Sequence, residues 1–384
     1  MHLPAERILV IRLGALGDVV RTTSLVPGLK RLDPAMELTW ITDAAAAPLV
    51  GYHGDVRFVR TPDEPGAWRE TQFDWVISLD DSRVACHLAS LLRSLQLSGA
   101  YRAADGSLRY TPDLEAWFGM GLLRPEEDGG LAEANRLKQA NTRTFGEILF
   151  EGLRLPGPVE RPLVQVPPAA RVEAGRVMVD LGALTGTDLA GERRGPVVAL
   201  NTGAGGRWKY KSWGEEQTAQ LAARLHDELG ATVLVAGGVD EVVRNARIVA
   251  AADRPHVLAA PVVPDLLVFT ALLGRCDAVV TSDSLAMHLS LSQGVRTIAF
   301  FGPTSDAEID LFGLGEKVAT SLPCRRCYLA DCDVRPHCME SIGVARLFDA
   351  TARWLARPRW SRPSGPAGRI SGAGRVSGES RPES

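Results

Sequence analysis

The chain has 384 residues, 45% of them hydrophobic and 23% charged, so it can bury a large core and should form about two domains. Its formal net charge of −3 gives no overall electrostatic reason to bind nucleic acid, and we expect no such partner. The sequence shows neither a signal-peptide pattern nor an apolar run of roughly 18 residues, so we expect a cytoplasmic protein without a transmembrane segment.

The first half alternates apolar runs with amphipathic stretches, a pattern typical of a parallel sheet with crossover helices. We expect strands near residues 7–13, 37–42, 56–60 and 74–79 and helices near 19–32 and 83–95. Pro27 should kink the first of these helices. Residues 156–196 are rich in proline, glycine and charge, which favours a connection between domains.

The second half repeats the alternation. We expect strands near residues 197–201, 232–236, 277–281 and 295–301 and helices near 213–229, 241–251, 265–274 and 284–293. The sequence therefore predicts an α/β protein of two Rossmann-like domains facing each other across a cleft. The first domain would cover residues 1–170, a connection 171–195 and the second domain 196–360. The tail 361–384 is rich in Ser, Gly, Pro and Arg without an apolar period, so we expect it to be disordered.

The first loop, "RLGALGD", leaves a strand and opens a helix, an arrangement that suits an anion. It lacks the G-x-G-x-x-G spacing, which disfavours a nicotinamide oxidoreductase. Gly14 and Gly17 either shape a tight turn or let an acceptor approach closely. Asp18 is either an acidic first-turn residue favoured by the helix dipole or a general base at the cleft.

Two loops of the second half are candidates for an anion site beyond the carboxyl ends of the strands. "NTGAGGRWKYKSW" supplies Arg207, Lys209 and Lys211, which suit a diphosphate or are merely solvated. "TSDSLAMH" ends a strand and opens a helix, so free N–H groups near Ser284 would face an anion. Asp283 as a helix cap is the alternative reading.

Taken together and in order, "RLGALGDVV", "NTGAGGRWKYKSW", "AGGVDE", "SDSLAMH", "FGPTSDAEI" and a late cysteine cluster resemble glycosyltransferase family 9, the heptosyltransferase-like enzymes. The resemblance covers about residues 7–356. It implies the GT-B architecture and an inverting, metal-independent transfer of a sugar, a heptose first of all. The implied donor is a nucleotide diphosphate sugar, ADP-heptose before others. The implied acceptor is a hydroxyl of a cell-envelope glycan or glycolipid, which would bring the enzyme to the inner face of the membrane.

The resemblance also assigns roles to individual residues. Asp18 matches the catalytic base. Donor-side positions are matched by Thr202, Gly203, Lys211, Glu241, Asp283, Ser284, Leu285 and His288, with Glu241 contacting the ribose. Family members commonly read "GDT" where this chain has "SDS", and the hydroxyl of Ser284 keeps a hydrogen-bonding group there. Acceptor-side candidates are Gly14, Gly17, Arg21 and Arg83, with His87 and Arg93 nearby as either ligands or a solvated helix face.

Two other classes of function stay open. A nonhydrolysing nucleotide-sugar epimerase would share the fold and donor site but needs acid and base groups on both sides of the sugar ring. A noncatalytic sugar-nucleotide-binding module would not need Asp18, so that residue favours the transferase.

The late cysteine cluster contains Cys324, Cys327, Cys332 and Cys338 in a C-x2-C-x4-C-x5-C spacing. Four thiolates so close in sequence could hold one tetrahedral zinc or iron ion that pins a loop. Free thiols or a labile disulfide are the alternatives. We expect a structural role for this cluster and no cofactor for catalysis.

Overall fold

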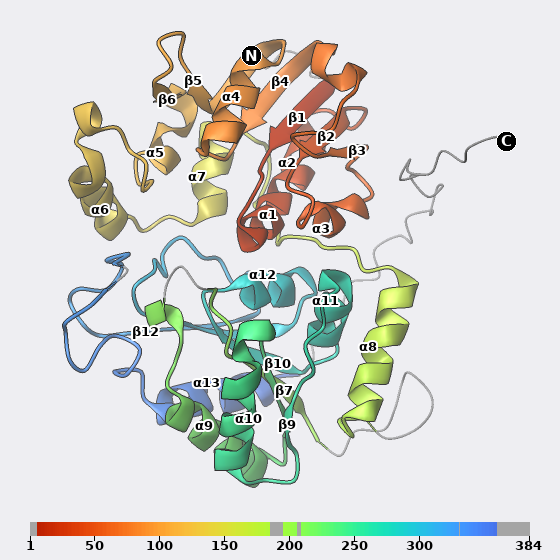
Figure 1. The fold of residues 1–384 in the computed structure, drawn as a ribbon, viewed down its shortest axis with the longest axis vertical. Coiled ribbons are helices and arrows are strands. Elements are labelled where there is room, and N and C mark those ends of the chain that lie inside the picture. The colour runs from red at the N-terminus through yellow and green to blue at the C-terminus, as the bar shows by residue number, and fades with distance from the viewer. Residues whose placement is uncertain (1–5, 185–194, 206–208, 330, 359–384) are drawn as a thin grey trace, which may run out of the picture.

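The computed structural model describes residues 6–184, 195–205, 209–329 and 331–358, and Figure 1 shows them as two α/β bodies joined end to end. The predicted tail 361–384 lies outside the described residues, as does Arg207.

The first body is built on a six-stranded sheet in the order β3-β2-β1-β4-β5-β6. Its strands are β1 (Arg7–Ile11), β2 (Glu37–Ile41), β3 (Phe58–Arg60), β4 (Phe73–Ser78), β5 (Ser94–Arg102) and β6 (Leu108–Tyr110). All neighbours pair in parallel except β6, which is antiparallel to β5. The helices are α1 (Leu16–Thr22), α2 (Val26–Leu32), α3 (Ala47–Gly51), α4 (Arg83–Leu91), α5 (Glu115–Phe118), α6 (Gly130–Ala140) and α7 (Phe145–Gly152).

The second body repeats this plan with a parallel sheet in the order β12-β11-β10-β7-β8-β9. Its strands are β7 (Val197–Asn201), β8 (Thr232–Ala236), β9 (Val257–Ala259), β10 (Ala278–Ser282), β11 (Arg296–Phe301) and β12 (Gly315–Ala319). The helices are α8 (Pro168–Asp180), α9 (Glu215–Leu229), α10 (Val242–Ala252), α11 (Leu266–Gly274), α12 (Leu285–Ser292) and α13 (Val344–Leu355).

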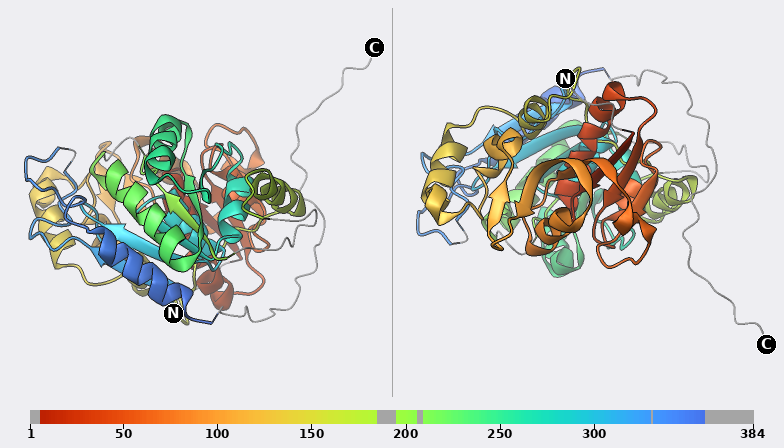
Figure 2. Two further views of the ribbon diagram at one scale, coloured as in Figure 1. Left: turned by 90° about the horizontal axis from the view of Figure 1, so that it is seen from below. Right: turned by 90° about the horizontal axis from the view of Figure 1, so that it is seen from above.

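Helices cover both faces of each sheet because the central strands are apolar on both sides. Along β7, Val198 packs with α9, α10 and α13, whereas Val197 packs with α8, α11 and α12. Figure 2 shows these two helical layers on either side of the second sheet. In each sheet, successive strands are added first on one side of the starting strand and then on the other. This switch point lies between β1 and β4 in the first sheet and between β7 and β10 in the second. This strand order confirms the predicted pair of Rossmann-like domains. Ligands of such sheets bind at the switch points.

The two bodies share an apolar cluster. Val20 of α1 and Leu49 of α3 pack with residues of α11 and α12, among them Ala286 and Leu289. Helix α8, which comes from the predicted connection, buries Ala174 in the same cluster. The domain boundaries 1–170 and 196–360 stay a prediction, and the two sheets lie within them.

Several expected elements differ in the structure. The helix expected at 19–32 is divided into α1, a 3-10 turn (Thr23–Leu25) and α2, which carries Pro27 in its first turn, where proline costs no hydrogen bond. The helix expected to reach residue 95 ends at Leu91, because β5 begins at Ser94. Among the described residues, no helix is long and apolar enough to cross a bilayer.

Candidate active site

Asp18 lies in the first turn of α1, at the switch point of the first sheet. Its carboxylate is held between two guanidinium groups: Oδ2 lies 2.5 Å from Arg12 Nη2, and Oδ1 lies 2.8 Å from Arg21 Nη2. Burial would raise the pKa of Asp18, but Arg21, Arg12 and His288 outweigh it and hold the pKa well below its usual value. The side chain still keeps 28% of its surface exposed, so a substrate can reach an ionised carboxylate.

The loop before Asp18 is held by a second carboxylate that sequence reasoning missed. The backbone N–H groups of Leu13 and Gly14 donate to Asp80 Oδ2 at 3.2 and 3.3 Å. Asp80 is buried just beyond the end of β4, the strand beside β1. Asp80 therefore fixes the β1–α1 loop. Its position directly after a predicted strand is a signal that the sequence does carry.

Arg21 is the predicted acceptor residue with the most defined surroundings. Its guanidinium carbon lies 4.3 Å from the ring centroid of Phe145 and 5.0 Å from that of Trp117. Aromatic faces attract a cation and hold its plane, so the guanidinium is fixed beside Asp18. Arg83, by contrast, is exposed at the start of α4.

The opposite side of the candidate site comes from the second domain. Lys211 Nζ lies 3.1 Å from Asp283 Oδ2, and Asp283 also pairs with Thr304. Burial would raise the pKa of Asp283, but Lys211, His288 and the Thr304 hydrogen bond overcome this and lower it. Burial lowers the pKa of His288 to about 4, so its ring is neutral at pH 7.

The two domains meet at Gly17. A Cβ atom at this position would lie 2.8 Å from His288 Cδ2 and 3.7 Å from Leu285 Cα. A side chain here would therefore collide with the buried ring of His288. The glycine lets the first turn of α1, which carries Asp18, lie against the first turn of α12.

Ser284 and Leu285 form the beginning of α12. Ser284 is the N-cap residue, but its hydroxyl makes no capping bond and instead lies 2.8 Å from Thr281 Oγ1 and accepts from Asn201 Nδ2 at 3.2 Å. The N–H groups of the first turn are thus not used by the side chain of the cap. They lie at the switch point between β7 and β10, beyond the carboxyl end of β10.

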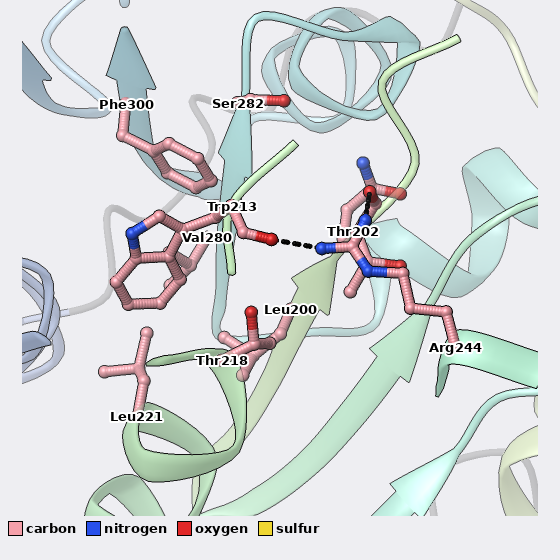
Figure 3. Close-up of a pocket in the computed structure, with 10 residues that line it drawn as sticks. Leu200, Thr202, Trp213, Thr218, Leu221, Arg244, Val280, Ser282 and Phe300 are labelled. Atoms are coloured by element: carbon pink, nitrogen blue, oxygen red, sulfur yellow. Dashed lines mark hydrogen bonds between the residues drawn. The ribbon is translucent and has the colours of Figure 1, made fainter. Parts of the chain in front are cut away.

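The remaining donor-side residues lie at the ends of β7 and β8. A Cβ at Gly203 would lie 3.2 Å from Glu241 Oε2, so this carboxylate borders the loop after β7. Thr202 donates to Asn245 Oδ1 at 2.6 Å. Arg244 donates to the carbonyl oxygens of Thr202 and Trp213 (Figure 3). These three residues line a small cavity of about 10 Å³.

Three further polar residues close to the contact between the domains were not anticipated. Buried Lys138 of α6 places its Nζ 4.1 Å from the ring centroid of Tyr328, whose hydroxyl donates to Glu308 Oε1 at 3.4 Å. Burial raises the pKa of Glu308, while Arg21 and Lys138 oppose this rise. The Phe145 N–H also donates across the domains to the Glu308 carbonyl oxygen at 2.9 Å. No sequence pattern pairs these segments, which lie more than 150 residues apart.

The four clustered cysteines differ in their surroundings. Cys324 is exposed, Cys327 and Cys332 are partly buried, and Cys338 is buried against Gly302 in the core of the second domain. Within the described ranges, which omit residue 330 of this segment, no three His, Cys, Asp or Glu side chains are arranged to hold a metal ion. The predicted metal centre therefore finds no support in the structure.

The chain is similar in sequence to known glycosyltransferases. Residues 159–332 match the model of glycosyltransferase family 9 (heptosyltransferase). Lipopolysaccharide heptosyltransferase 1 of Pseudomonas aeruginosa is 23% identical over 339 residues, covering 86% of this chain and 88% of the relative.

Two solved structures have the same fold over nearly their whole length. The family 9 glycosyl transferase of Veillonella parvula superposes with a TM-score of 0.69 at 20% identity, covering 92% of this chain and 98% of the other. The E. coli ADP-heptose lipopolysaccharide heptosyltransferase II gives 0.62 at 19% identity, covering 91% and 98%. The predicted GT-B architecture is confirmed by both. Sequence match and fold agree: the chain is similar to the heptosyltransferases of glycosyltransferase family 9 and is a glycosyltransferase.

Proposed function

We propose that the enzyme transfers a sugar, a heptose first of all, from a nucleotide diphosphate donor to a hydroxyl of a cell-envelope glycan or glycolipid, without a divalent metal. The observation that carries this proposal is the contact of Gly17 with His288, which brings the Asp18 carboxylate to the start of α12. The names of the relatives support lipopolysaccharide synthesis as the process and ADP-heptose as the donor.

The donor diphosphate would bind at the first turn of α12. N–H groups and the positive end of the helix dipole favour an anion there, and Lys211 adds a formal charge. The pairing of Lys211 with Asp283 fixes the ammonium group before the donor arrives. Thr202, Gly203 and Glu241 would then face the nucleoside, with Glu241 accepting from the ribose hydroxyls. Lys211 and the N-terminus of α12 would take the place of a divalent metal by stabilising the diphosphate as it leaves.

Asp18 would act as the base from the opposite side of the candidate site. It would accept the proton of the acceptor hydroxyl while that oxygen attacks the anomeric carbon on the side away from the diphosphate. Attack from the opposite side inverts the configuration.

The two arginines beside Asp18 make this base weak in the empty enzyme, because they stabilise its charged form. An acceptor bearing a carboxylate or phosphate would engage Arg21 and weaken its pull on Asp18. The pKa of Asp18 would then rise only when an acidic acceptor is present. We infer that Arg21 selects acidic acceptors and couples their binding to proton removal, with Arg83 as a further cation at the rim.

The chemistry of the acceptor would also determine where in the cell the enzyme works. A glycolipid acceptor would hold it peripherally at the inner face of the cytoplasmic membrane, and a soluble glycan would leave it in the cytoplasm. Either location fits a chain whose described helices are too short or too polar to span a bilayer.

A nucleotide panel and a transfer assay test the proposal. ADP and ADP-heptose should raise the melting temperature more than UDP or GDP and their sugars. ADP release should then require both the donor and an acceptor, namely an acidic core glycan that does not yet carry the heptose. Turnover of the donor sugar to an isomer without acceptor would indicate an epimerase instead. Equal stabilisation by all three diphosphates would contradict the ADP assignment.

A further inference from the structure

The start of α10 turns one face toward the residues that follow β7. Glu241, Arg244 and Asn245 have the i, i+3, i+4 spacing that places side chains on the same side of a helix. The turn that joins β8 to this helix is tight, because a Cβ at Gly237 would lie 2.7 Å from Glu241 Cβ and 3.1 Å from Asn245 Nδ2. The three side chains are therefore held at the carboxyl end of β8, on the donor side of the candidate site.

All three side chains lie against Thr202 and Gly203, which directly follow β7. Glu241 borders Gly203, where an added Cβ would lie 3.2 Å from its Oε2. Asn245 Oδ1 accepts the hydroxyl of Thr202 at 2.6 Å, and Arg244 Nη1 donates to the Thr202 carbonyl oxygen at 3.3 Å. The end of β7 is thus held by Asn245 as well as by Arg244.

Arg244 also holds a second, separate part of the chain. Its Nη2 donates to the carbonyl oxygen of Trp213, which precedes α9. Figure 3 shows the guanidinium group between the carbonyl oxygens of Thr202 and Trp213, with a hydrogen bond to each. Among the described residues, no other donor reaches the Trp213 carbonyl oxygen. Loss of Arg244 would therefore leave a main-chain acceptor of a buried residue without a partner, and the chain there would have to move to satisfy it.

The chemistry of arginine suits this role. A guanidinium group presents several N–H donors in one rigid plane, whereas the ammonium group of lysine is a compact point donor. Burial lowers the pKa of Arg244, while Glu215 and Glu241 oppose this fall. An arginine stays protonated in a protein even so, and all of its N–H donors are retained.

Lys211 lies close in sequence to the carbonyl that Arg244 holds. It ends a 3-10 turn (Lys209–Lys211) only two residues before Trp213. Its Nζ lies 3.1 Å from Asp283 Oδ2, next to the start of α12. A displacement of the main chain at Trp213 would therefore be passed to Lys211 and would move its ammonium group away from the first turn of α12.

We infer that Arg244 is a positioning residue, which fixes the main chain at Trp213 so that Lys211 can meet the donor diphosphate. The inference rests on the proposed role of Lys211 and extends it. Arg244 would act through the chain and not by touching the donor. The cavity that it lines with Thr202 and Trp213 has a volume of about 10 Å³, which is room for at most one water molecule and not for a phosphate group.

Calorimetric titration with ADP tests this coupling in a double-mutant cycle. The cycle compares the parent, Arg244→Met, Lys211→Ala and the variant with both changes. The matched control is Arg247→Met, which removes an arginine from the next turn of the same helix. Arg247 pairs with Glu215 of α9 and makes no contact with Thr202 or Trp213. The melting temperature of each variant is measured alongside.

The expected result is a loss that depends on Lys211. Arg244→Met should weaken ADP binding by about three- to tenfold, which is less than the loss caused by removing Lys211 itself. In the Lys211→Ala background the same change should weaken binding by less than about twofold, because the ammonium group that Arg244 positions is absent. Equal losses with and without Lys211 would show a direct or global effect of Arg244 and overturn the inference. So would an equal loss in Arg247→Met.

Arg244→Lys separates the position of the chain from the charge. Lysine keeps the positive charge but lacks the planar fork that joins the two carbonyl oxygens. The ADP affinity of Arg244→Lys should therefore lie between those of the parent and Arg244→Met. Full affinity in Arg244→Lys would show that the charge alone is sufficient and refute the positioning role. If Arg244→Met melts too early to be titrated, Arg244→Lys takes its place in the cycle.

The titration of the parent separates this inference from the proposed function. If the parent binds UDP or GDP more tightly than ADP, the ADP assignment is wrong. The cycle is then run with the tighter nucleotide, because Lys211 would meet the diphosphate and not the base. If the parent binds no nucleoside diphosphate, both the proposed donor site and the role of Arg244 are wrong.

Discussion

Replacing Gly17 with alanine separates the stability of the enzyme from its activity. Gly17 is a helical residue of α1, and alanine is favoured over glycine in a helix by up to about 1 kcal/mol. The new Cβ would nevertheless lie 2.8 Å from His288 Cδ2, about 0.6 Å closer than ordinary van der Waals contact allows. His288 is buried, so its ring has little room to move away.

The collision acts where the two domains meet over the reacting groups. Either the His288 ring or the whole first turn of α1 must shift by a few tenths of an ångström, and Asp18 shifts with that turn. Misplacement of a catalytic group by about 1 Å can cost roughly two orders of magnitude in rate, so a shift of a few tenths of an ångström should cost about tenfold. We therefore expect Gly17→Ala to lower kcat by about tenfold and to change the melting temperature by only a few degrees, because the gain in helix propensity partly offsets the cost of overpacking.

The assay compares ADP release and thermal melting for the parent, Gly17→Ala and the control Gly51→Ala. Gly51 ends α3, and a Cβ there would meet nothing within 4 Å. The control should keep its kcat. Full activity of Gly17→Ala would refute the close approach of the two domains as a requirement for catalysis. A parallel loss of melting temperature would instead indicate a purely structural role.

Three further changes test individual residues. Asp18→Asn should remove turnover while a calorimetric titration still shows donor affinity near that of the parent, because the lost carboxylate acts on the acceptor proton. Lys211→Ala should weaken ADP binding by more than about tenfold and slow transfer further, because the ammonium meets charge in both the ground state and the transition state. Arg21→Met should move the acid limb of the pH dependence of kcat/KM to higher pH, because losing a neighbouring cation raises the pKa of Asp18.

Each of these expectations has a contrary result. A kcat of Asp18→Asn near that of the parent excludes Asp18 as the base. Unchanged ADP affinity in Lys211→Ala leaves that lysine as a partner of Asp283 alone. An acid limb that stays in place or moves to lower pH in Arg21→Met separates Arg21 from the ionisation of Asp18. A chelator such as EDTA should leave the transfer rate of the parent unchanged.

The elements predicted best were those whose apolar pattern and flanking turn residues are enough to define them. Strands β7 and β8 were predicted to the residue, because each is a run of five buried side chains between turn signals. Strand β5 was missed, since only two residues separate it from α4 and its exposed end alternates weakly. At Gly99 the strand has a positive φ of 106° and passes so close to Ser78 that no Cβ fits, a condition set by the neighbouring strand and invisible in the sequence.

The residues of the candidate site also fall into those that local sequence predicts and those that it does not. Lys211, Asp283 and His288 follow strands whose ends were predictable, so their convergence at one switch point followed from topology. The two arginines that hold Asp18 are also near it in sequence, since Arg12 directly follows β1 and Arg21 lies one turn along α1. The pairing of Lys138 with Tyr328 and Glu308 depends on how two separately folded segments dock, and no local pattern carries that information.

The apolar cluster shared by the two domains makes the chain a single cooperative unit in unfolding. Val20, Leu49 and Leu289 are essentially fully buried, and each would expose apolar surface worth roughly 1.5 to 3 kcal/mol if the domains parted. Neither sheet can therefore melt and leave its neighbour at its full stability. A calorimetric scan should show one transition, not two, and a fragment confined to either half should aggregate through the surface it leaves uncovered.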